Sequence, residues 1–357
     1  MTSVIPPTMR SLCVHAYVKP TEFGIADIPV PKITTPNQVL IRVHAACINP
    51  VDMEIAGGNF KAIMTPPFPL KLGFDLSGTV VEIGSSVDNV AVGDEVFCSL
   101  LATDTGAWSE YALATASLLT HKPKSLSHVE AASLPMVAMT AVQALDKVPN
   151  GLAGKTILIA AGLGGVGSIA CQIAKSVYGA KKVITTVSTD NVSKVNDLFG
   201  KGAVDEVIDY KKSDVLKEIP HGSVDVLLDT VGVSKEYYPL LLKNSGSITS
   251  IYGTIDSKSV KAAIPNLHIP LLVQLALDFR AGWKWLHAWW YGIYWQGTLQ
   301  NANSPDLQRV AGWVDEGKLK PIVGRTVKFE DIKAVREACV QMSSASRSIG
   351  KTVIEII

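Results

Sequence analysis

The sequence has almost no excess charge of either sign. It contains 33 Lys and Arg residues against 32 Asp and Glu residues, which gives a formal net charge of +1. Such a chain lacks the broad electrostatic attraction that draws basic proteins to nucleic acids or to anionic membranes. We therefore expect no nucleic-acid partner, and the net charge gives no reason to expect binding to a lipid surface.

Cysteine and long apolar runs are also scarce. Five cysteines are scattered without a C-x-x-C pair, at positions 13, 47, 98, 171 and 339. This usage favours a reducing compartment, and we expect a cytoplasmic protein. The first twenty residues lack the apolar core of a signal peptide. The longest uncharged apolar stretch, Leu267 to Leu277, is too short to span a bilayer, so no transmembrane segment is expected.

What is present is typical of a globular protein. The chain has 357 residues, of which 47% are hydrophobic and 18% charged, and this composition excludes disorder. The length suggests two domains. The first third is rich in β-branched residues between Gly, Pro, Asn and Asp clusters, and we expect strands at 39–46, 78–83 and 92–97.

From about residue 129 the pattern changes to alternating strands and helices. Residues 128–145 have helical spacing that is interrupted at Pro135. An apolar strand at 156–161 precedes a helix at about 166–177. Further strands are expected at 183–187, 207–208, 224–228 and 247–251, and 322–357 returns to strand, helix and strand. Repeated β-α-β units predict an α/β fold with a doubly wound parallel sheet.

The turn after the first of these strands is rich in glycine. Residues 162–167 read Gly-Leu-Gly-Gly-Val-Gly, directly between the buried strand and the amphipathic helix. In this context Gly162 would allow a tight turn, Gly164 would let the backbone approach a pyrophosphate, and Gly167 would let helix and strand pack closely. The pattern favours dinucleotide binding. The alternative is a tight turn without a ligand.

The end of the second strand bears on the choice of dinucleotide. An acid is typical there when the adenosine ribose carries free hydroxyls. Here the strand ends in Val187-Ser188, and Asp190 comes later. Ser188 and Lys194 could instead bind a 2′-phosphate, which predicts NADPH as the cofactor. The alternative is that Lys194 is an ordinary solvated lysine.

An ordered set of motifs runs along nearly the whole chain. It comprises Asn49-Pro-Val-Asp52, Gly73-Phe-Asp-Leu-Ser-Gly78, Val92-Gly-Asp-Glu-Val96, Gly106-Ala-Trp-Ser-Glu-Tyr111, Ala131-Ala-Ser-Leu-Pro135 and Gly350-Lys-Thr-Val-Ile354. This set resembles the medium-chain dehydrogenase/reductase superfamily, and most of all its quinone oxidoreductase and enoyl reductase branch. The resemblance implies a GroES-like β-rich catalytic domain (1–128 and 303–357), a Rossmann cofactor domain (129–302) and an active site in the cleft between them.

The positions that hold the catalytic zinc in the alcohol dehydrogenases of that superfamily are changed. Asn49, Phe74 and Met136 stand there, and none of these residue types is a plausible zinc ligand. Only Cys98 lies between Val96 and Tyr111, so the structural-zinc lobe is missing as well. Cys47 is off the ligand position and is expected to be a buried strand residue. We expect no metal site.

The resemblance then implies zinc-independent reduction of an apolar unsaturated carbonyl or a quinone. Enoyl reductases of this branch often carry a proton-donating Tyr where this chain has Phe60. Asn49 is therefore the main candidate for a catalytic hydrogen bond, Tyr111 is a weaker one, and water could supply the proton. Phe60, Phe74 and Met136 are the expected pocket residues.

The remaining cofactor contacts are expected from the resemblance, position by position. They are Asn49, Thr140, Leu163, Gly165, Val166, Tyr210, Val231, Gly232, Gly253 and Lys351. Two other functions stay open beside the NADPH-dependent reductase. One is a secondary-metabolite enzyme, such as a trans-acting enoyl reductase for polyketides or an enzyme of that kind that uses the pocket for non-redox chemistry. The other is a non-catalytic NADPH-binding structural or regulatory protein, as zeta-crystallin-like members of this fold show.

An aromatic segment has no place in these motifs. Residues 283–295 hold five of the seven tryptophans, and the stretch before them is apolar. So many large rings are typical of a subunit interface or core, of a wall of the substrate pocket, or of a membrane-surface contact. The sequence leaves these three open, and it leaves open whether the protein is a monomer or a homodimer.

Overall fold

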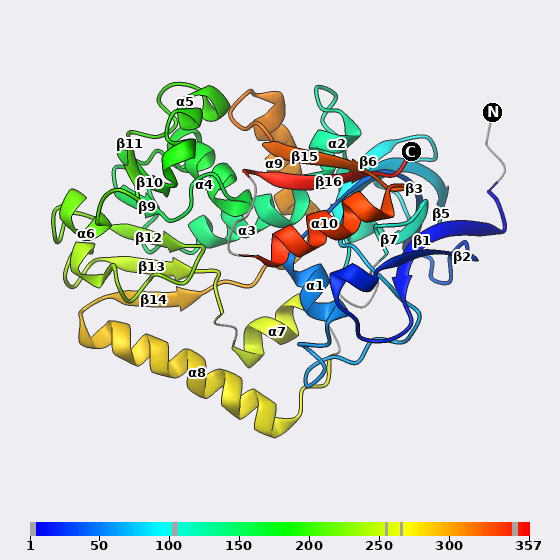
Figure 1. The fold of residues 1–357 in the computed structure, drawn as a ribbon, viewed down its shortest axis with the longest axis horizontal. Coiled ribbons are helices and arrows are strands. Elements are labelled where there is room, and N and C mark those ends of the chain that lie inside the picture. Colours follow the sequence, from blue (N-terminus) through cyan, green and yellow to red (C-terminus); the bar gives the residue numbers. More distant parts are fainter. Residues whose placement is uncertain (1–4, 102–105, 254–255, 265–266, 345–348) are drawn as a thin grey trace. The chain divides into compact units, whose positions relative to one another are not determined.

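The computed structural model describes residues 5–101, 106–253, 256–264, 267–344 and 349–357. The chain forms two compact units (Figure 1). Unit 1 comprises 1–136, 302–316 and 321–357, and unit 2 comprises 137–301 and 317–320. The first boundary lies at 136/137, whereas the sequence placed it at 128/129. The reason is that helix α2 (His128–Ala132) packs on the main sheet of unit 1, against strands β3 and β5.

Unit 1 is built from two β-sheets. A small antiparallel sheet has the order β2-β1-β4, and a seven-stranded sheet has the order β15-β16-β3-β5-β6-β8, with β7 paired to β3. The strands are β1 (Thr8–Val14), β2 (Gly24–Pro29), β3 (Gln38–Cys47), β4 (Leu70–Lys71), β5 (Asp75–Ile83), β6 (Glu95–Ser99), β7 (Tyr111–Thr115), β8 (Leu119–His121), β15 (Val323–Lys328) and β16 (Lys351–Glu355).

The expected strands at 39–46 and 78–83 are confirmed within β3 and β5. The expected strand at 92–97 begins later, at Glu95, because residues before it form a turn. Gly93 has φ of +99°, and the Asp94 carboxylate accepts a hydrogen bond from the backbone N–H of Ala91 at 2.9 Å. The helices of this unit are α1 (Pro50–Ala56), α2, α9 (Ser304–Asp315) and α10 (Ile332–Ser343).

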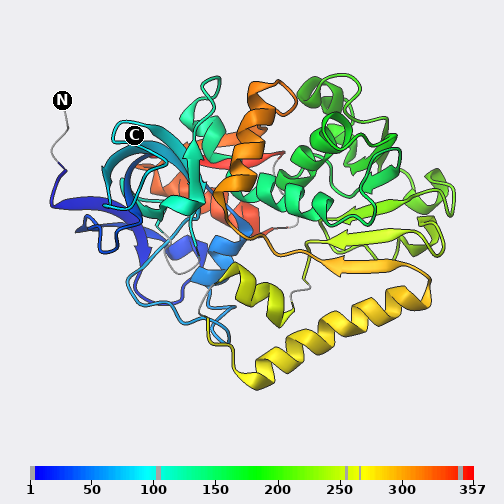
Figure 2. The same cartoon turned by 180° about the vertical axis from the view of Figure 1, so that it is seen from behind.

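Unit 2 is the expected doubly wound parallel sheet, with helices on both of its faces (Figure 2). Its strand order is β11-β10-β9-β12-β13-β14, and every neighbouring pair is parallel. The strands are β9 (Thr156–Ile159), β10 (Lys182–Val187), β11 (Glu206–Asp209), β12 (Val226–Asp229), β13 (Ser247–Ser250) and β14 (Tyr294–Gly297). The strand order runs outward from β9 to β11 on one side and from β12 to β14 on the other, so β9 and β12 flank the topological switch point of the sheet. Ligands of such sheets bind beyond the carboxyl ends of the strands at this point.

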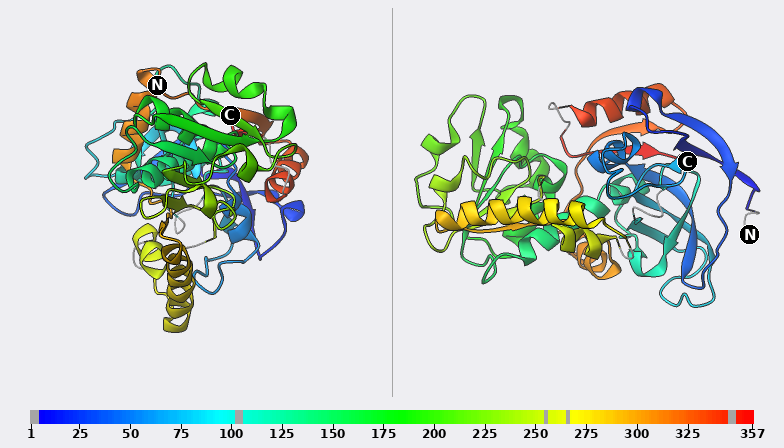
Figure 3. Two further views of the ribbon diagram at one scale, coloured as in Figure 1. Left: turned by 90° about the vertical axis from the view of Figure 1, so that its left-hand side faces the viewer. Right: turned by 90° about the horizontal axis from the view of Figure 1, so that it is seen from below.

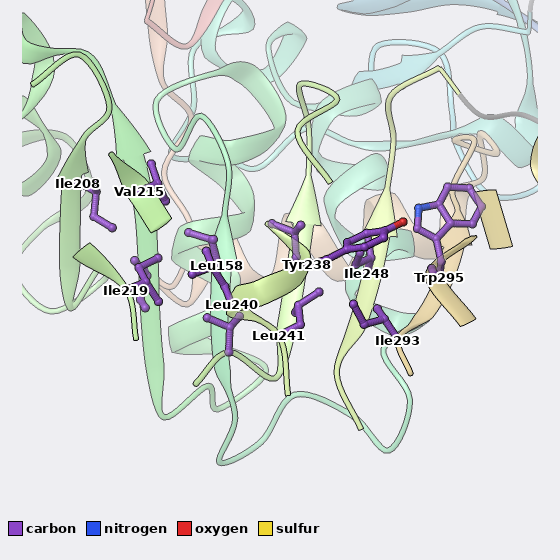
Figure 4. Close-up of a cluster of buried hydrophobic side chains, with 14 residues drawn as sticks. Leu158, Ile208, Val215, Ile219, Tyr238, Leu240, Leu241, Ile248, Ile293 and Trp295 are labelled. Carbon is purple, nitrogen blue, oxygen red and sulfur yellow. The ribbon is translucent and has the colours of Figure 1, made fainter. Parts of the chain in front are cut away.

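One hydrophobic cluster of unit 2 lies on one face of this sheet (Figure 4). Leu158, Ile248 and Trp295 project from β9, β13 and β14, and Tyr238 and Leu240 pack over them. Each of these side chains is at most 6% exposed. Burial of a large apolar side chain contributes about 1.5–3 kcal/mol, so this cluster fixes the strands whose ends carry the loops described below.

The helices of unit 2 are α3 (Pro135–Asp146), α4 (Gly165–Ser176), α5 (Lys194–Phe199), α6 (Val215–Glu218), α7 (Ser257–Ala263) and α8 (Leu271–Trp290). Helix α3 begins at Pro135, where the sequence predicted an interruption; proline fits the first turn of a helix, which needs no N–H donor. The aromatic segment divides into the end of α8 and strand β14. Figure 3 shows α8 as a long helix beside β14, the edge strand of the sheet.

Candidate functional site

The glycine-rich turn of unit 2 joins the end of β9 to the start of α4. Glycine is required at Gly162, because a Cβ there would lie 2.1 Å from the Thr185 hydroxyl on β10, and at Gly167, where it would lie 2.3 Å from the Ala161 carbonyl oxygen. A Cβ at Gly164 would meet only the Ala161 oxygen, at 3.2 Å. Close packing thus explains Gly162 and Gly167, whereas a Cβ at Gly164 would be tight against a single backbone oxygen.

The residue with left-handed backbone in this turn is Ala161, with φ of +55°. The sequence expectation assigned the tight turn to Gly162, so the structure moves that role one residue earlier. An alanine in this region is uncommon, and strained residues of this kind gather at ligand sites. Here the turn carries the backbone of Leu163, Gly165 and Val166 to the first turn of α4.

The start of α4 fits a pyrophosphate. Gly164 is its N-cap, and the helix runs for 12 residues from Gly165. The first N–H groups of a helix have no partner within it, and they carry the positive end of the helix dipole. Residues 162–167 therefore bring backbone N–H groups to the start of a helix, which is the arrangement that binds phosphates.

Next to this turn, the end of β10 carries a chain of hydrogen bonds. Asn191 donates through Nδ2 to the Ser188 hydroxyl at 2.9 Å, and Lys194 donates through Nζ to Asn191 Oδ1 at 3.0 Å. The structure therefore brings Ser188 and Lys194 together, and adds Asn191 between them. Asp190 is exposed, and it is Asn191 that binds Ser188.

The end of β11 adds a second cation to this edge. The N–H of Tyr210 donates to the Val187 carbonyl at 3.1 Å. The next residue, Lys211, therefore lies at the carboxyl ends of β10 and β11, as Ser188 does. Lys211 Nζ lies 5.4 Å from the centre of the Tyr210 ring, which is 48% exposed. The edge thus combines hydroxyl, amide, ammonium and aromatic groups, a set that fits a phosphorylated ribose with its adenine.

The loop after β12 is organised by a buried carboxylate. Asp229 Oδ1 accepts the N–H groups of Val231, Gly232 and Val233 at 2.7–3.1 Å, and Oδ2 accepts that of Ser234 at 3.1 Å. These bonds hold Val231 exposed and Gly232 at φ of +93°, as the expected cofactor loop requires. Gly253, also left-handed at φ of +63°, follows β13, and Thr140 lies buried on α3.

In unit 1, Asn49 lies in a buried polar cluster where β3 leads into α1. Its Oδ1 accepts a hydrogen bond from Lys351 Nζ at 2.5 Å, and its Nδ2 donates to Asp75 Oδ2 at 2.9 Å. Lys351 also donates to the Ile48 carbonyl at 3.0 Å. A lysine only donates and a carboxylate only accepts, so these two partners fix which way the Asn49 amide points.

Local backbone geometry places Lys351. It begins β16, whose residue Val353 pairs with Cys47 of β3. Gly350 before it has φ of +60°, and a Cβ there would lie 2.1 Å from the Ile322 carbonyl oxygen. The glycine of the late Gly-Lys motif is thus needed to turn the chain and to bring the lysine beside Asn49.

Two carboxylates share this cluster. Asp52 accepts the backbone N–H of Asn49 at 2.6 Å, and its Oδ1 is buried without a hydrogen-bond partner among the described residues. Burial raises the pKa of Asp52 well above its usual value, and the nearby charge of Asp75 adds to the rise. Burial also raises the pKa of Asp75, while Lys351 and Asn49 oppose that rise. One lysine therefore lies among two buried acids, and the rise in pKa is opposed by Lys351 at both of them.

The expected pocket residues divide between this cluster and its surroundings. Phe74 is buried directly before Asp75, and the Met136 N–H donates to Asp75 Oδ1 at 3.1 Å. Both therefore lie beside the cluster. Phe60 lies in the turn after α1, half-buried and outside the hydrogen-bonded group.

Tyr111 has a different place from the one a proton donor would need. It pairs with Arg42 in the middle of β3, about 16 Å along that strand from Cys47. Its ring is packed with Met9, Val30 and Leu40. The structure thus gives Tyr111 a packing role and does not bring it to Asn49.

Zinc fits these residues poorly. Among the described residues, no three His, Cys, Asp or Glu side chains gather as a metal would need. Of the positions that would carry zinc, Asn49 is bound to Asp75 and Lys351, and Phe74 and Met136 offer no suitable donor. All five cysteines are free and buried. Cys47 donates its thiol to the Thr352 carbonyl, and burial raises its pKa to about 12, as suits the structural role expected for it.

Comparisons with known proteins agree with this architecture. Residues 35–124 match the alcohol dehydrogenase GroES-like domain, and residues 203–354 match the zinc-binding dehydrogenase family. The chain is 33% identical to NAD(P)H oxidoreductase RTN4IP1, mitochondrial, of Bos taurus, over 93% of this chain and 85% of the relative. The chain belongs to the medium-chain dehydrogenase/reductase superfamily, as its motifs predicted.

Two further relatives describe the chemistry of this superfamily. An NADPH-dependent alkenal/one oxidoreductase, chloroplastic, of Arabidopsis thaliana is 36% identical over 64% of this chain and 58% of its own length. The solved structure of the quinone oxidoreductase from Coxiella burnetii has a TM-score of 0.78 at 29% identity, and the match covers 98% of this chain and all of that one. These relatives support a redox role and a nicotinamide cofactor.

Sequence reasoning missed Asp52 and Asp75 beside Asn49, and three residues of unit 2 that shape the site. Asp229 and Asn191 act through hydrogen bonds that no short motif marks, and Lys211 depends on the pairing of β10 with β11. The position of Asp229 at the end of a parallel strand, before a Thr-Val-Gly turn, was the available signal. A buried acid there would be expected to bind the N–H groups of the turn.

Proposed function

We propose that this protein is a zinc-independent, NADPH-dependent reductase of an activated carbon–carbon double bond or of a quinone. The observation that carries the proposal is the Asn49 amide, which stands at a zinc-ligand position and is held by Asp75 and Lys351. The site thus offers a fixed hydrogen-bond donor where an alcohol dehydrogenase would hold a Lewis acid.

The chemistry follows from that donor. A reduced nicotinamide, when bound, supplies a hydride. On a substrate such as an enone, hydride addition at the β-carbon moves an electron pair onto the carbonyl oxygen, which becomes an enolate. An amide nitrogen carries two hydrogens, so Asn49 can donate one to Asp75 and one to this oxygen. Water then supplies the proton, since Phe60 replaces the usual tyrosine.

The polar groups at the carboxyl ends of β10 and β11 in unit 2 support the choice of NADPH. Ser188, Asn191 and Lys194 form a connected group of donors at the end of β10, and Lys211 stands at the next strand. A 2′-phosphate would gain charge-assisted hydrogen bonds there, whereas a free ribose diol would find no carboxylate at the strand end. The Arabidopsis relative, named as NADPH-dependent, agrees with this choice.

We also propose that the protein is located in the cytoplasm, because its five cysteines are unpaired. The relative from Bos taurus carries a mitochondrial name, and a mitochondrial matrix would also keep these thiols reduced. Fractionation of cells that express the tagged full-length chain distinguishes the two compartments.

Steady-state turnover tests the reductase. Purified protein is mixed with NADPH and either a small enone or a small quinone, and the loss of NADPH absorbance is followed. Turnover of either substrate class supports the proposal. NADPH binding without turnover of any substrate contradicts it and favours the structural or regulatory alternative. Turnover with a carrier-bound enoyl thioester alone would instead favour the secondary-metabolite enzyme.

A further inference from the structure

Helix α8 presents an apolar face to solvent. Leu272, Phe279 and Trp290 are 80%, 73% and 79% exposed, and Leu275, Trp283 and Leu286 between them are also exposed. At about 100° per residue, these six side chains fall within an arc of roughly 80° and form one stripe about 27 Å long. We call it the outer stripe.

The opposite face of α8 attaches the helix to unit 2. Ala288 is buried, and the helix packs against β14 and α7. On the flank of the helix, Asp278 accepts hydrogen bonds from the N–H and hydroxyl of Ser257 on α7, at 2.8 and 2.9 Å. Lys284 lies over the ring of Trp295, 5.8 Å from its centre. These contacts hold the helix in place without the outer stripe. The apolar side chains of the outer stripe are therefore not needed for the packing of unit 2.

The exposed apolar surface is wider than the outer stripe alone. Leu271, Trp285 and Trp289 are exposed beside it, and they widen the mainly apolar arc to roughly 160°, which also contains the exposed Asp278. Trp285 and Trp289 stack at 6.4 Å, as Phe279 and Trp283 do at 6.5 Å. The side chains expose roughly 1,000 Å² of apolar surface by their size. The largest patch on a soluble monomer is about 300–600 Å², so this face calls for a partner.

Charge around α8 is basic, unlike the charge of the whole chain. Arg280 is exposed next to one border of the apolar arc, and Lys258 and Lys261 are exposed on the adjoining α7, whereas Lys284 lies on the attached face over Trp295. The acid of the helix, Asp278, is engaged by Ser257. A surface with tryptophan and leucine in its middle and cations at its border matches a bilayer with anionic headgroups.

We propose that α8 docks this protein on the surface of an anionic phospholipid bilayer, with the helix lying in the plane of the interface. No helix in the described part of the chain is both long enough and apolar enough to cross a membrane. The proposal is independent of the proposed enzymatic function, because the outer stripe contains no residue of the candidate site and lies across the helix from the buried Ala288.

A second copy of the chain fits this face less well. The seam between two helices is narrower than the 160° arc and would leave Trp285 and Trp289 in water. In an antiparallel pair about a twofold axis, like borders face each other, so Arg280 near the middle of the helix would meet the Arg280 of the other copy. A lipid surface covers the whole arc and neutralises that border.

Vesicle co-sedimentation tests the proposal. The full-length protein is mixed with vesicles of phosphatidylcholine and phosphatidylglycerol, and in parallel with vesicles of phosphatidylcholine alone. We expect binding that is stronger to the anionic vesicles. The double variant Leu272→Glu/Trp290→Glu should bind at least about tenfold more weakly. The control Val92→Glu/Val340→Glu adds the same charge at exposed aliphatic positions elsewhere and should bind as the wild type does.

Tryptophan fluorescence gives a second measurement on the unaltered protein. Trp283, Trp285, Trp289 and Trp290 are exposed, so insertion should shift their emission to shorter wavelength, and brominated lipid should quench it. Wild-type protein that neither sediments with anionic vesicles nor shifts its emission overturns the proposal. Equal binding by the double variant also overturns it. So does a dimer in sedimentation equilibrium that the double variant dissociates, without vesicle binding, because α8 would then pair with a second copy.

Discussion

Lys351 Nζ lies 2.5 Å from Oδ1 of Asn49, although 302 residues separate the two along the chain. The contact closes a buried group in which the Asn49 amide bridges a cation and the Asp75 carboxylate. Neither charge faces water, so each depends on the other through the amide. The expected contact of Lys351 with the cofactor stays a prediction, and in the structure this lysine is a positioning residue for Asn49.

Replacing that lysine should therefore affect both folding and turnover. Lys351→Met leaves the Asp75 charge buried without its cation, which typically costs about 3–5 kcal/mol. The Asn49 amide also loses the partner that fixes its orientation, and we expect kcat to fall at least about tenfold while the Kd for NADPH stays unchanged. Chemical denaturation, kcat and cofactor titration are measured together. Lys124→Met, at an exposed position, is the control, and a stability loss with unchanged kcat would show that Lys351 is merely structural.

The Asn49 side chain itself should govern kcat. Loss of one transition-state hydrogen bond costs on the order of 10²-fold, so Asn49→Ala should lower kcat by about that factor. Phe60→Tyr restores the residue type that is usual in enoyl reductases and should leave turnover similar or raise it. Steady-state kinetics on an enone compare both variants with the wild type. If Asn49→Ala turns over at the wild-type rate, the amide has no catalytic role.

Much of unit 2 could be predicted because its signals are local. The apolar strand, the glycine turn and the amphipathic helix follow one another directly, and the structure has them at β9, residues 162–167 and α4. The reason why each glycine of the turn is needed depends on packing. Thr185 on the neighbouring strand explains Gly162, and no pattern within the turn could reveal that contact.

The parts that could not be predicted depend on long-range packing. Tyr111 was a candidate acid by position, yet the pairing of β7 with the middle of β3 puts it in a hydrophobic cluster. Asp75 and Lys351 come together with Asn49 only through the pairing of β16 and β5 with β3. The aromatic segment was ambiguous because α8 is apolar on both faces, and periodicity alone cannot tell a buried helix from an exposed one.

Cofactor preference should depend on Lys194. A charge-assisted hydrogen bond contributes about 1.5–3 kcal/mol, or about ten- to a hundredfold in affinity. Lys194→Ala should weaken NADPH by about that factor and leave NADH nearly unchanged, as measured by fluorescence quenching. Lys201→Ala, on an exposed lysine in the turn after α5, is the matched control. Tighter binding of NADH than NADPH by the wild type would indicate that Asp190 sets the choice.

The metal content follows from the ligand set. Asn49, Phe74 and Met136 cannot form a tetrahedral zinc site, so the purified protein should contain less than roughly one tenth of a zinc ion per chain. Elemental analysis of protein expressed with added zinc measures this. Stoichiometric zinc that survives dialysis against a chelator would contradict the proposed mechanism, because a Lewis acid would then be at hand.

The buried Asp52 should make stability depend on pH. Its pKa in the folded protein is raised well above the ordinary value of 3.8. At a pH above 3.8 and below the folded-state pKa, the folded protein therefore keeps a proton that the unfolded protein has lost. The free energy of unfolding contributed by this group therefore falls as pH rises through that window. Asp52→Asn cannot titrate, and relative to wild type it should gain stability between about pH 5 and about pH 8, whatever constant cost its amide brings.

Urea denaturation at the two pH values measures that difference, and Asp190→Asn, at an exposed position, shows how the loss of an unburied carboxylate behaves. Comparing slopes matters more than comparing absolute stabilities, because the Asn amide also replaces the oxygen that accepts the Asn49 N–H. Equal pH slopes for Asp52→Asn and wild type would mean that Asp52 is ionised in the folded protein. Lys351 would then face two buried negative charges, and the orientation of the Asn49 amide would depend on both.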